Sequence, residues 1–246
     1  MYRFRQIFKM DLLNLVTNPM WLFYNIGFPL LLTLILGFLN SGAYGGAINA
    51  YDYYGVAMLI FAVFNTATIA ANSFMEERIK SPNLRLVHSP IPAFYIHLSK
   101  LLATFVFSFT CHLLVAVMLS LTAGVSYSAQ IGLMLALLLL SEFFASALGV
   151  MLCCACKSEN LANQILSFVI TMFAILGGLF FPLDGYGAAI EKLSYLSPVK
   201  WVLTASFQMI YDGNNALFLP AMLVLAALSA LSVFLCVRLF RTEDYL

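Results

Sequence analysis

Charged residues are scarce in this chain. Lysine, arginine, aspartate and glutamate make up 9% of its 246 residues, whereas hydrophobic residues make up 63%. A soluble globular domain carries about 25% charged residues. The shortage excludes an ordinary soluble domain and predicts a membrane protein in contact with lipid. A net charge of +1 also gives no indication of a nucleic-acid partner.

The motifs of common hydrolases are missing as well. The chain has no Gly-Lys dipeptide, and therefore no G-x-x-x-x-G-K-[ST] loop to bind the phosphates of ATP. It also lacks H-E-x-x-H and G-x-S-x-G. We therefore predict that the chain by itself is not an enzyme, has no catalytic residue and binds no cofactor.

The cysteines are few and lie in or beside apolar runs. There are five, and none falls in a segment that we place outside the cell, so no disulfide is expected. Three of them form the run Cys-Cys-Ala-Cys at 153–156. Metal sites space their ligands by two or more residues, so the run favours small apolar side chains at a helix end. We predict no metal site.

Long apolar runs dominate the remaining sequence. A helix needs about 20 residues to cross about 30 Å of hydrocarbon. Six runs qualify, and they leave no room for a soluble domain. The predicted fold is an all-α membrane protein, a single transmembrane domain over residues 1–246, with spans at 20–39, 54–74, 99–122, 130–152, 161–181 and 217–240.

Basic residues are distributed unequally between the two sides of these spans. Ten of the twelve lie in the N-terminal segment, the second and fourth loops and the C-terminal end, whereas only Lys192 and Lys200 lie on the other side. Loops rich in lysine and arginine stay in the cytoplasm. The bias predicts a multi-pass protein of the plasma membrane with both termini cytoplasmic.

The first nineteen residues predict a helix on the inner membrane surface. Between residues 4 and 16, apolar side chains gather on one helical face, away from Arg5 and Lys9. Asp11 interrupts this apolar face, so the pattern is imperfect. Asn18-Pro19 marks a turn into the first span.

The cytoplasmic segment 75–98 holds a second short helix. Ser81-Pro82 is a helix-start signal and Ser89-Pro90 ends the helix. About two turns lie between them, with apolar side chains at Leu84, Leu86 and Val87. Two interpretations stay open, a docking element for a cytoplasmic partner and a solvated loop with incidental prolines.

Three polar residues lie near the midplane of the spans. Glu142 is the only acidic residue deep in any span, and His112 lies at nearly the same depth in the preceding one. A buried carboxylate costs a few kcal/mol unless it is paired. We expect Glu142 to face a transport path or the bundle interior with His112 as its partner, and Asn65 to lie at similar depth. A purely structural hydrogen bond is the alternative.

The segment 182–216 after the fifth span is too apolar for a free loop. Pro182 and Pro198 divide it into pieces too short to span a bilayer. Short helices dipping into the outer leaflet would satisfy their own backbone groups. We expect burial of seven apolar residues, Leu193, Tyr195, Leu196, Val199, Trp201, Val202 and Leu203.

These features together resemble the type-2 ABC exporter permeases. That family carries a Glu-Arg pair after the second span and a leucine-rich short helix ending near proline. It also has a small-residue pair, an aromatic residue and proline at the end of the fifth span. The matching positions are Glu77-Arg78, Leu84, Leu86 and Pro90, then Gly177-Gly178, Phe181-Pro182 and Leu196-Ser197-Pro198. Lys80-Ser81-Pro82-Asn83 departs from the family's glycine-threonine-like run.

The resemblance implies a division of work between chains. Two permease chains, identical or homologous, would form the path, and two separate ATPase subunits would bind ATP and Mg. The residues that couple the permease to the ATPases would be Glu77, Arg78, Pro82, Leu84, Leu86 and Val87. The re-entrant hairpin at 182–216 would cover the outer exit of the transport path.

The substrate class follows only from the apolar spans. They suit an amphipathic drug, a peptide or a lipid-linked molecule equally. An intramembrane enzyme or a scaffold using Glu142 and His112 is the alternative function. Copurification of an ATPase would favour the exporter, and activity of the isolated chain would favour the enzyme.

Overall fold

The computed structural model describes residues 2–42, 49–75, 93–125, 127, 130–181, 183 and 187–239. All regular structure within these residues is helical, and six helical segments are long and apolar enough to cross a membrane. The prediction of an all-α chain with six spans is confirmed. A short helix, α1, precedes the first span, and short helices stand between the fifth and sixth.

The elements follow one another with few breaks. The first span is continuous through α2, a π-helical stretch η1 and α3. The bounds are α1 Tyr2–Val16, α2 Pro19–Leu22, η1 Phe23–Gly27, α3 Phe28–Leu39, α4 Ala50–Met75, α6 Ala93–Ala123, α7 Ile131–Cys156, α8 Glu159–Gly177, α9 Ala188–Ser194, α10 Pro198–Phe207, η2 Gln208–Asp212 and α11 Phe218–Leu239.

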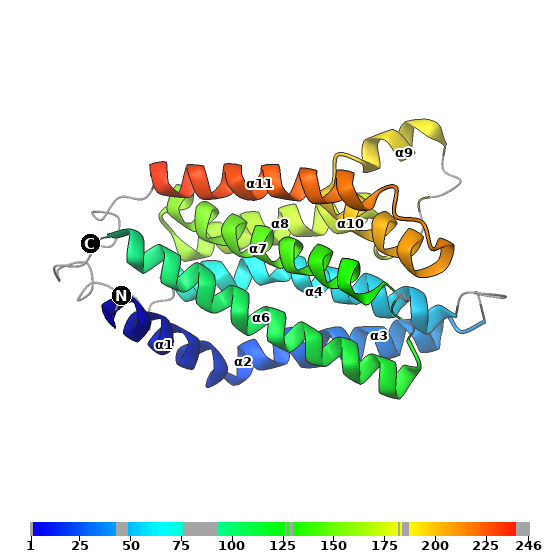
Figure 1. Cartoon of the computed structure of the whole chain (residues 1–246), viewed down its shortest axis with the longest axis horizontal. Coiled ribbons are helices and arrows are strands. Elements are labelled where there is room, and N and C mark those ends of the chain that lie inside the picture. The colour runs from blue at the N-terminus through cyan, green and yellow to red at the C-terminus, as the bar shows by residue number, and fades with distance from the viewer. Residues whose placement is uncertain are drawn as a thin grey trace.

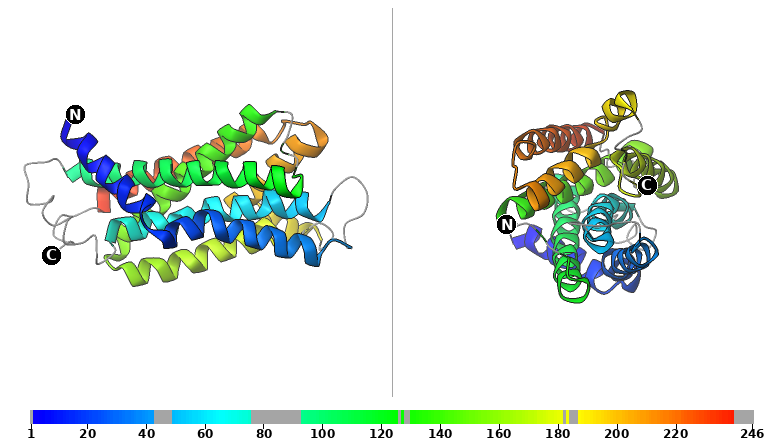
Figure 2. Two further views of the ribbon diagram at one scale, coloured as in Figure 1. Left: turned by 90° about the horizontal axis from the view of Figure 1, so that it is seen from below. Right: turned by 90° about the vertical axis from the view of Figure 1, so that its right-hand side faces the viewer.

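The long helices lie side by side along one axis (Figure 1). One end of the bundle holds the start of α1, the end of α4, the start of α6 and the end of α11. The opposite end holds α9 and α10, and α9 stands out from the bundle in Figure 1 and in the right-hand view of Figure 2. The first and last described helices therefore begin and end on the same side of the bundle.

Helix α4 forms the centre of the bundle. In its most apolar window 83% of residues are buried, against 22% in the first span and 28% in α8 and in α11. Small residues such as Ala57, Ala67 and Ala71 are fully buried along it. Small side chains let helix backbones approach closely where lipid supplies no hydrophobic driving force. The helices that surround α4 are therefore held by close packing against it.

The crossing of α4 and α7 depends on Gly149. A Cβ at this position would collide with the backbone carbonyl of Ala67, which has no room to move aside. We expect Gly149→Ala to lower the free energy of unfolding by about 1–3 kcal/mol, because the two helices must separate. Gly132, in the same helix, has open space around it, so Gly132→Ala is the matched control. Thermal unfolding of both variants in detergent checks this, and equal melting temperatures would contradict it.

The fifth span ends earlier than the predicted boundary of 161–181. Helix α8 stops at Gly177 because Gly178 takes the left-handed conformation, with φ 79°, and its N–H bonds back to Ala174 and Ile175. Glycine adopts this conformation without strain and commonly ends helices. Phe181 therefore lies beyond the helix and is 45% exposed.

Helix α1 is fastened to the beginning of α6. Asp11 accepts hydrogen bonds from Lys100 Nζ at 2.9 Å and from Ser99 Oγ at 2.7 Å. Lys100 is only 1% exposed, so the ion pair is largely shielded from water. The carboxylate that interrupts the apolar face of α1 is thus its point of attachment. Helix α6 begins at Ala93, so residues 93–98 of the predicted cytoplasmic segment are helical.

Candidate functional site

A buried polar centre joins α4, α6 and α7. His112 Nδ1 lies 2.9 Å from Glu142 Oε2, and the Thr66 hydroxyl donates to Glu142 Oε1 at 2.5 Å. Glu142 and Thr66 are fully buried and His112 is 3% exposed. Each side chain comes from a different helix, and both carboxyl oxygens have a partner.

The hydrogen bonds remove much of the cost of burying this carboxyl group. A lone charge at the middle of a bilayer costs a few kcal/mol, and hydrogen bonds to its oxygens replace part of the hydration that it loses. Either the imidazole Nδ1–H donates to a carboxylate, or a carboxyl O–H donates to the imidazole. In both forms the pair holds α6 and α7 together, and Thr66 adds α4 to them.

The sequence predicts His112 as the partner of Glu142 and does not predict Thr66. Asn65, the neighbour that it named instead, donates to the carbonyl of Phe61 in its own helix at 2.9 Å and is half-buried. Helical geometry is the reason, since successive residues point about 100° apart and only one of them faces α7.

Two further polar contacts connect α4 with its neighbours. The hydroxyls of Ser73 and Thr104 lie 3.1 Å apart, which links α4 to α6. The side-chain amides of Asn72 and Asn163 bond to one another at 2.9 and 3.2 Å, which links α4 to α8. Interhelical hydrogen bonds of this kind stabilise bundles in membranes by about 1 kcal/mol each. The central helix is thus bonded through side chains to α6, α7 and α8.

Helix α10 packs against the small-residue pair Gly177-Gly178 at the end of α8. A Cβ at Gly177 would collide with the side chain of Val199, and the carbonyl of Gly178 accepts a 2.6 Å hydrogen bond from Tyr53. Ser197 caps α10 and also donates to the Phe173 carbonyl of α8 at 2.8 Å. Pro198 is the first residue of α10, where its missing N–H leaves no helical hydrogen bond unmade. Pro182 lies outside the described residues.

The apolar residues after the fifth span are only partly buried within this chain. Val199, Val202 and Leu203 are buried, whereas Tyr195 and Trp201 are half-buried. Leu193 is 51% and Leu196 72% exposed, so the predicted burial of these two is wrong for the single chain. They lie on and after the short helix α9, which projects from the bundle.

The predicted coupling residues Glu77, Arg78, Pro82, Leu84, Leu86 and Val87 lie outside the described residues. The segment 76–92 that contains them joins the end of α4 to the start of α6.

The described part of the chain contains no cluster of three or more histidine, cysteine, aspartate or glutamate side chains suited to a metal ion. All five cysteines are free thiols, and the sulfurs of Cys154 and Cys236 approach to 3.8 Å between α7 and α11.

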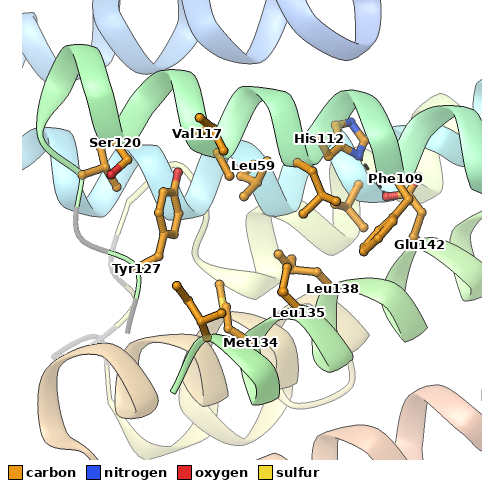
Figure 3. Close-up of a pocket in the computed structure, with 15 residues that line it drawn as sticks. Leu59, Phe109, His112, Val117, Ser120, Tyr127, Met134, Leu135, Leu138 and Glu142 are labelled. Atoms are coloured by element: carbon orange, nitrogen blue, oxygen red, sulfur yellow. Dashed lines mark hydrogen bonds and ion pairs between the residues drawn. The ribbon is translucent and has the colours of Figure 1, made fainter. Parts of the chain in front are cut away.

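A cavity adjoins the polar centre (Figure 3). It lies between α4, α6 and α7 and has a volume of about 410 Å³. His112 and Glu142 lie at one end, and Ser120 and Tyr127 lie at the other, toward the connection between α6 and α7. The buried polar centre therefore borders a largely apolar space.

Comparison with known proteins assigns the chain to a family. A sequence model of the ABC-2 type transporter family matches residues 2–211, from the first helix to the short helices before the sixth span. A search of curated proteins found no significant match.

Proposed function

The chain belongs to the ABC-2 type transporter family, and on this premise we propose that it is the membrane subunit of an ATP-driven exporter. In this family the membrane component transports, and separate subunits hydrolyse ATP. Two copies of the chain, or one copy and a homologue, enclose the path, and two ATPase subunits with bound ATP and Mg drive it. The match over residues 2–211 is the observation that carries this proposal.

Coupling to the ATPases takes place through residues 76–92 in this proposal. The segment joins α4, which forms the centre of the bundle, to α6, which packs beside α4. The Asp11–Lys100 pair fastens α1 to the start of α6. A force on the segment is therefore delivered to α1, α4 and α6 together. A transported ligand shifts the equilibrium between the inward-open and outward-open states only as far as its affinities for the two states differ.

The polar centre of Thr66, His112 and Glu142 keeps three helices together during this motion. Its full burial and complete hydrogen bonding at Glu142 support a place in the bundle interior rather than an open path. The three helices then move as one unit.

The short helices α9 and α10 cover the outer end of the path in the proposed assembly. The packing of α10 onto Gly177 supports a fixed position for it, and the exposed Leu193 and Leu196 are available to lipid or to the second chain. The apolar spans suit an amphipathic or hydrophobic substrate, such as a drug, a peptide or a lipid-linked molecule.

We expect both termini to be cytoplasmic, because ten of twelve basic residues fall on that side. Single cysteines at Gly45, Ser126 and Asp212 of a cysteine-free variant should then react with an impermeant thiol reagent in intact cells. A cysteine at Ser158, exposed between α7 and α8, is the control and should react only after permeabilisation. Protection of the first two sites would contradict the orientation, and Asp212 is less decisive because we expect its segment to fold into the membrane.

A further inference from the structure

The cavity beside the polar centre is bordered by exposed apolar side chains. Val117 and Ile131 line it and are also 56% and 58% exposed, on α6 and α7. Apolar side chains with this exposure on a membrane-spanning helix face the hydrocarbon. A molecule therefore reaches the cavity sideways from the bilayer, between α6 and α7.

The walls of the cavity are apolar, and its two ends carry polar atoms without partners. Leu59, Leu113 and Leu135 are among the wall residues. At one end the Tyr127 hydroxyl is buried and has no hydrogen-bond partner among the described residues, and at the other end the same holds for His112 Nε2. Buried polar atoms in native proteins almost always have a partner. A pure hydrocarbon chain leaves the Tyr127 hydroxyl unsatisfied, whereas an occupant with a hydrogen-bonding head group satisfies it.

The charges around the cavity favour an uncharged occupant over an anionic one. No lysine or arginine is among the described residues that line it, and Glu142 supplies the carboxyl group at its floor. Burial, together with the nearby Asp52 carboxylate, raises the pKa of Tyr127 above its ordinary value. Tyr127 therefore stays protonated and keeps its O–H as a donor.

We propose that this cavity is a binding site for an uncharged single-chain amphiphile that reaches it from the bilayer. Its hydroxyl or amide group bonds to Tyr127, and its chain runs along Leu113 and Leu135 toward His112. The rise from Ser120 to His112 along α6 is about 12 Å, enough for a medium-length chain. The volume of about 410 Å³ lies within the range of small-molecule sites. Binding here needs no ATPase, so the proposal goes beyond the exporter function and is tested without it.

The test uses the whole chain in phosphatidylcholine nanodiscs with two photoreactive probes. One is a monoacylglycerol with a diazirine in its acyl chain, and the other is a lysophosphatidylglycerol with the same chain and diazirine. After illumination, mass spectrometry locates the label. We expect the uncharged probe to label α6 and α7 around Leu113 and Leu135 at least about threefold more than the anionic probe, because only the former fits a site without cations.

Adjacent residues supply the matched variants. Leu113 lines the cavity, whereas Leu114 is 51% exposed and does not line it. Leu113→Trp fills the space and should lower labelling about tenfold, while Leu114→Trp should leave it unchanged. Tyr127→Phe removes one oxygen without altering packing and should lower labelling about threefold to tenfold. Equal labelling by both probes, or labelling that neither Leu113→Trp nor Tyr127→Phe reduces, would overturn the proposal.

Discussion

Aspartate at both Leu84 and Leu86 is expected to abolish ATP-driven transport and to weaken the complex with the ATPase subunits, while insertion into the membrane continues. In the proposed function these two leucines and Val87 fill a groove on the ATPase, with Glu77 and Arg78 at the base of the short helix. Loss of two apolar anchors from a small interface costs about 2–4 kcal/mol. The measurement is recovery of the complex from detergent extracts, together with the transport-stimulated ATPase rate.

A charge-matched variant separates loss of the leucines from gain of negative charge. Ser81→Asp combined with Ser89→Asp places two carboxylates in the same segment and keeps both leucines. Aspartate caps a helix as well as serine does, so the start of the short helix is retained. We expect this control to assemble normally. Normal complex recovery and normal ATPase stimulation in the leucine variant would contradict the coupling role and indicate that the segment is a solvated loop.

Alanine at Glu142 is expected to lower the free energy of unfolding by about 2–4 kcal/mol, because Thr66 and His112 lose their shared hydrogen-bond partner while still buried. Glutamine should cost less than about 1 kcal/mol, since its amide oxygen accepts from Thr66 and its amide N–H donates to His112 Nδ1. Thermal unfolding of the purified variants measures both effects.

Transport by Glu142→Gln then separates a structural role from a role of the charge. We expect transport near the wild-type rate, because glutamine retains the contacts among α4, α6 and α7. Lost transport in a stably assembled Glu142→Gln complex would contradict this account and would assign the charge to the path. Equal stability of the alanine variant and the wild type would contradict the structural role.

Hydropathy predicts the spans well because each must fill the same apolar thickness. The observed boundaries differ where local chemistry decides. Gly178 ends α8 four residues before the predicted boundary, and the helical start of α4 at Ala50 precedes the predicted start at Tyr54. Composition alone does not indicate which residue takes the left-handed conformation. It also does not indicate how far a helix continues beyond the hydrocarbon.

Part of the polar centre was predictable from depth, because Glu142 and His112 lie at similar distances from a short connection. Thr66 was not, since the rotation of α4 about its axis is set by packing of its small residues against α7. The Asp11–Lys100 pair was missed for a similar reason. Its partners are 89 residues apart, and the only signal was a carboxylate on an otherwise apolar helix face.

The composition of the complex tests the central claim most directly. A tagged copy of the chain, purified from membranes in mild detergent, is measured by native mass spectrometry, and its partners are identified by peptide sequencing. The account predicts an assembly of two permease chains and two ATP-binding subunits, with ATP hydrolysis that a Walker-motif variant of the partner abolishes. Recovery of the chain without any ATP-binding subunit, under conditions that preserve other membrane complexes, would contradict it.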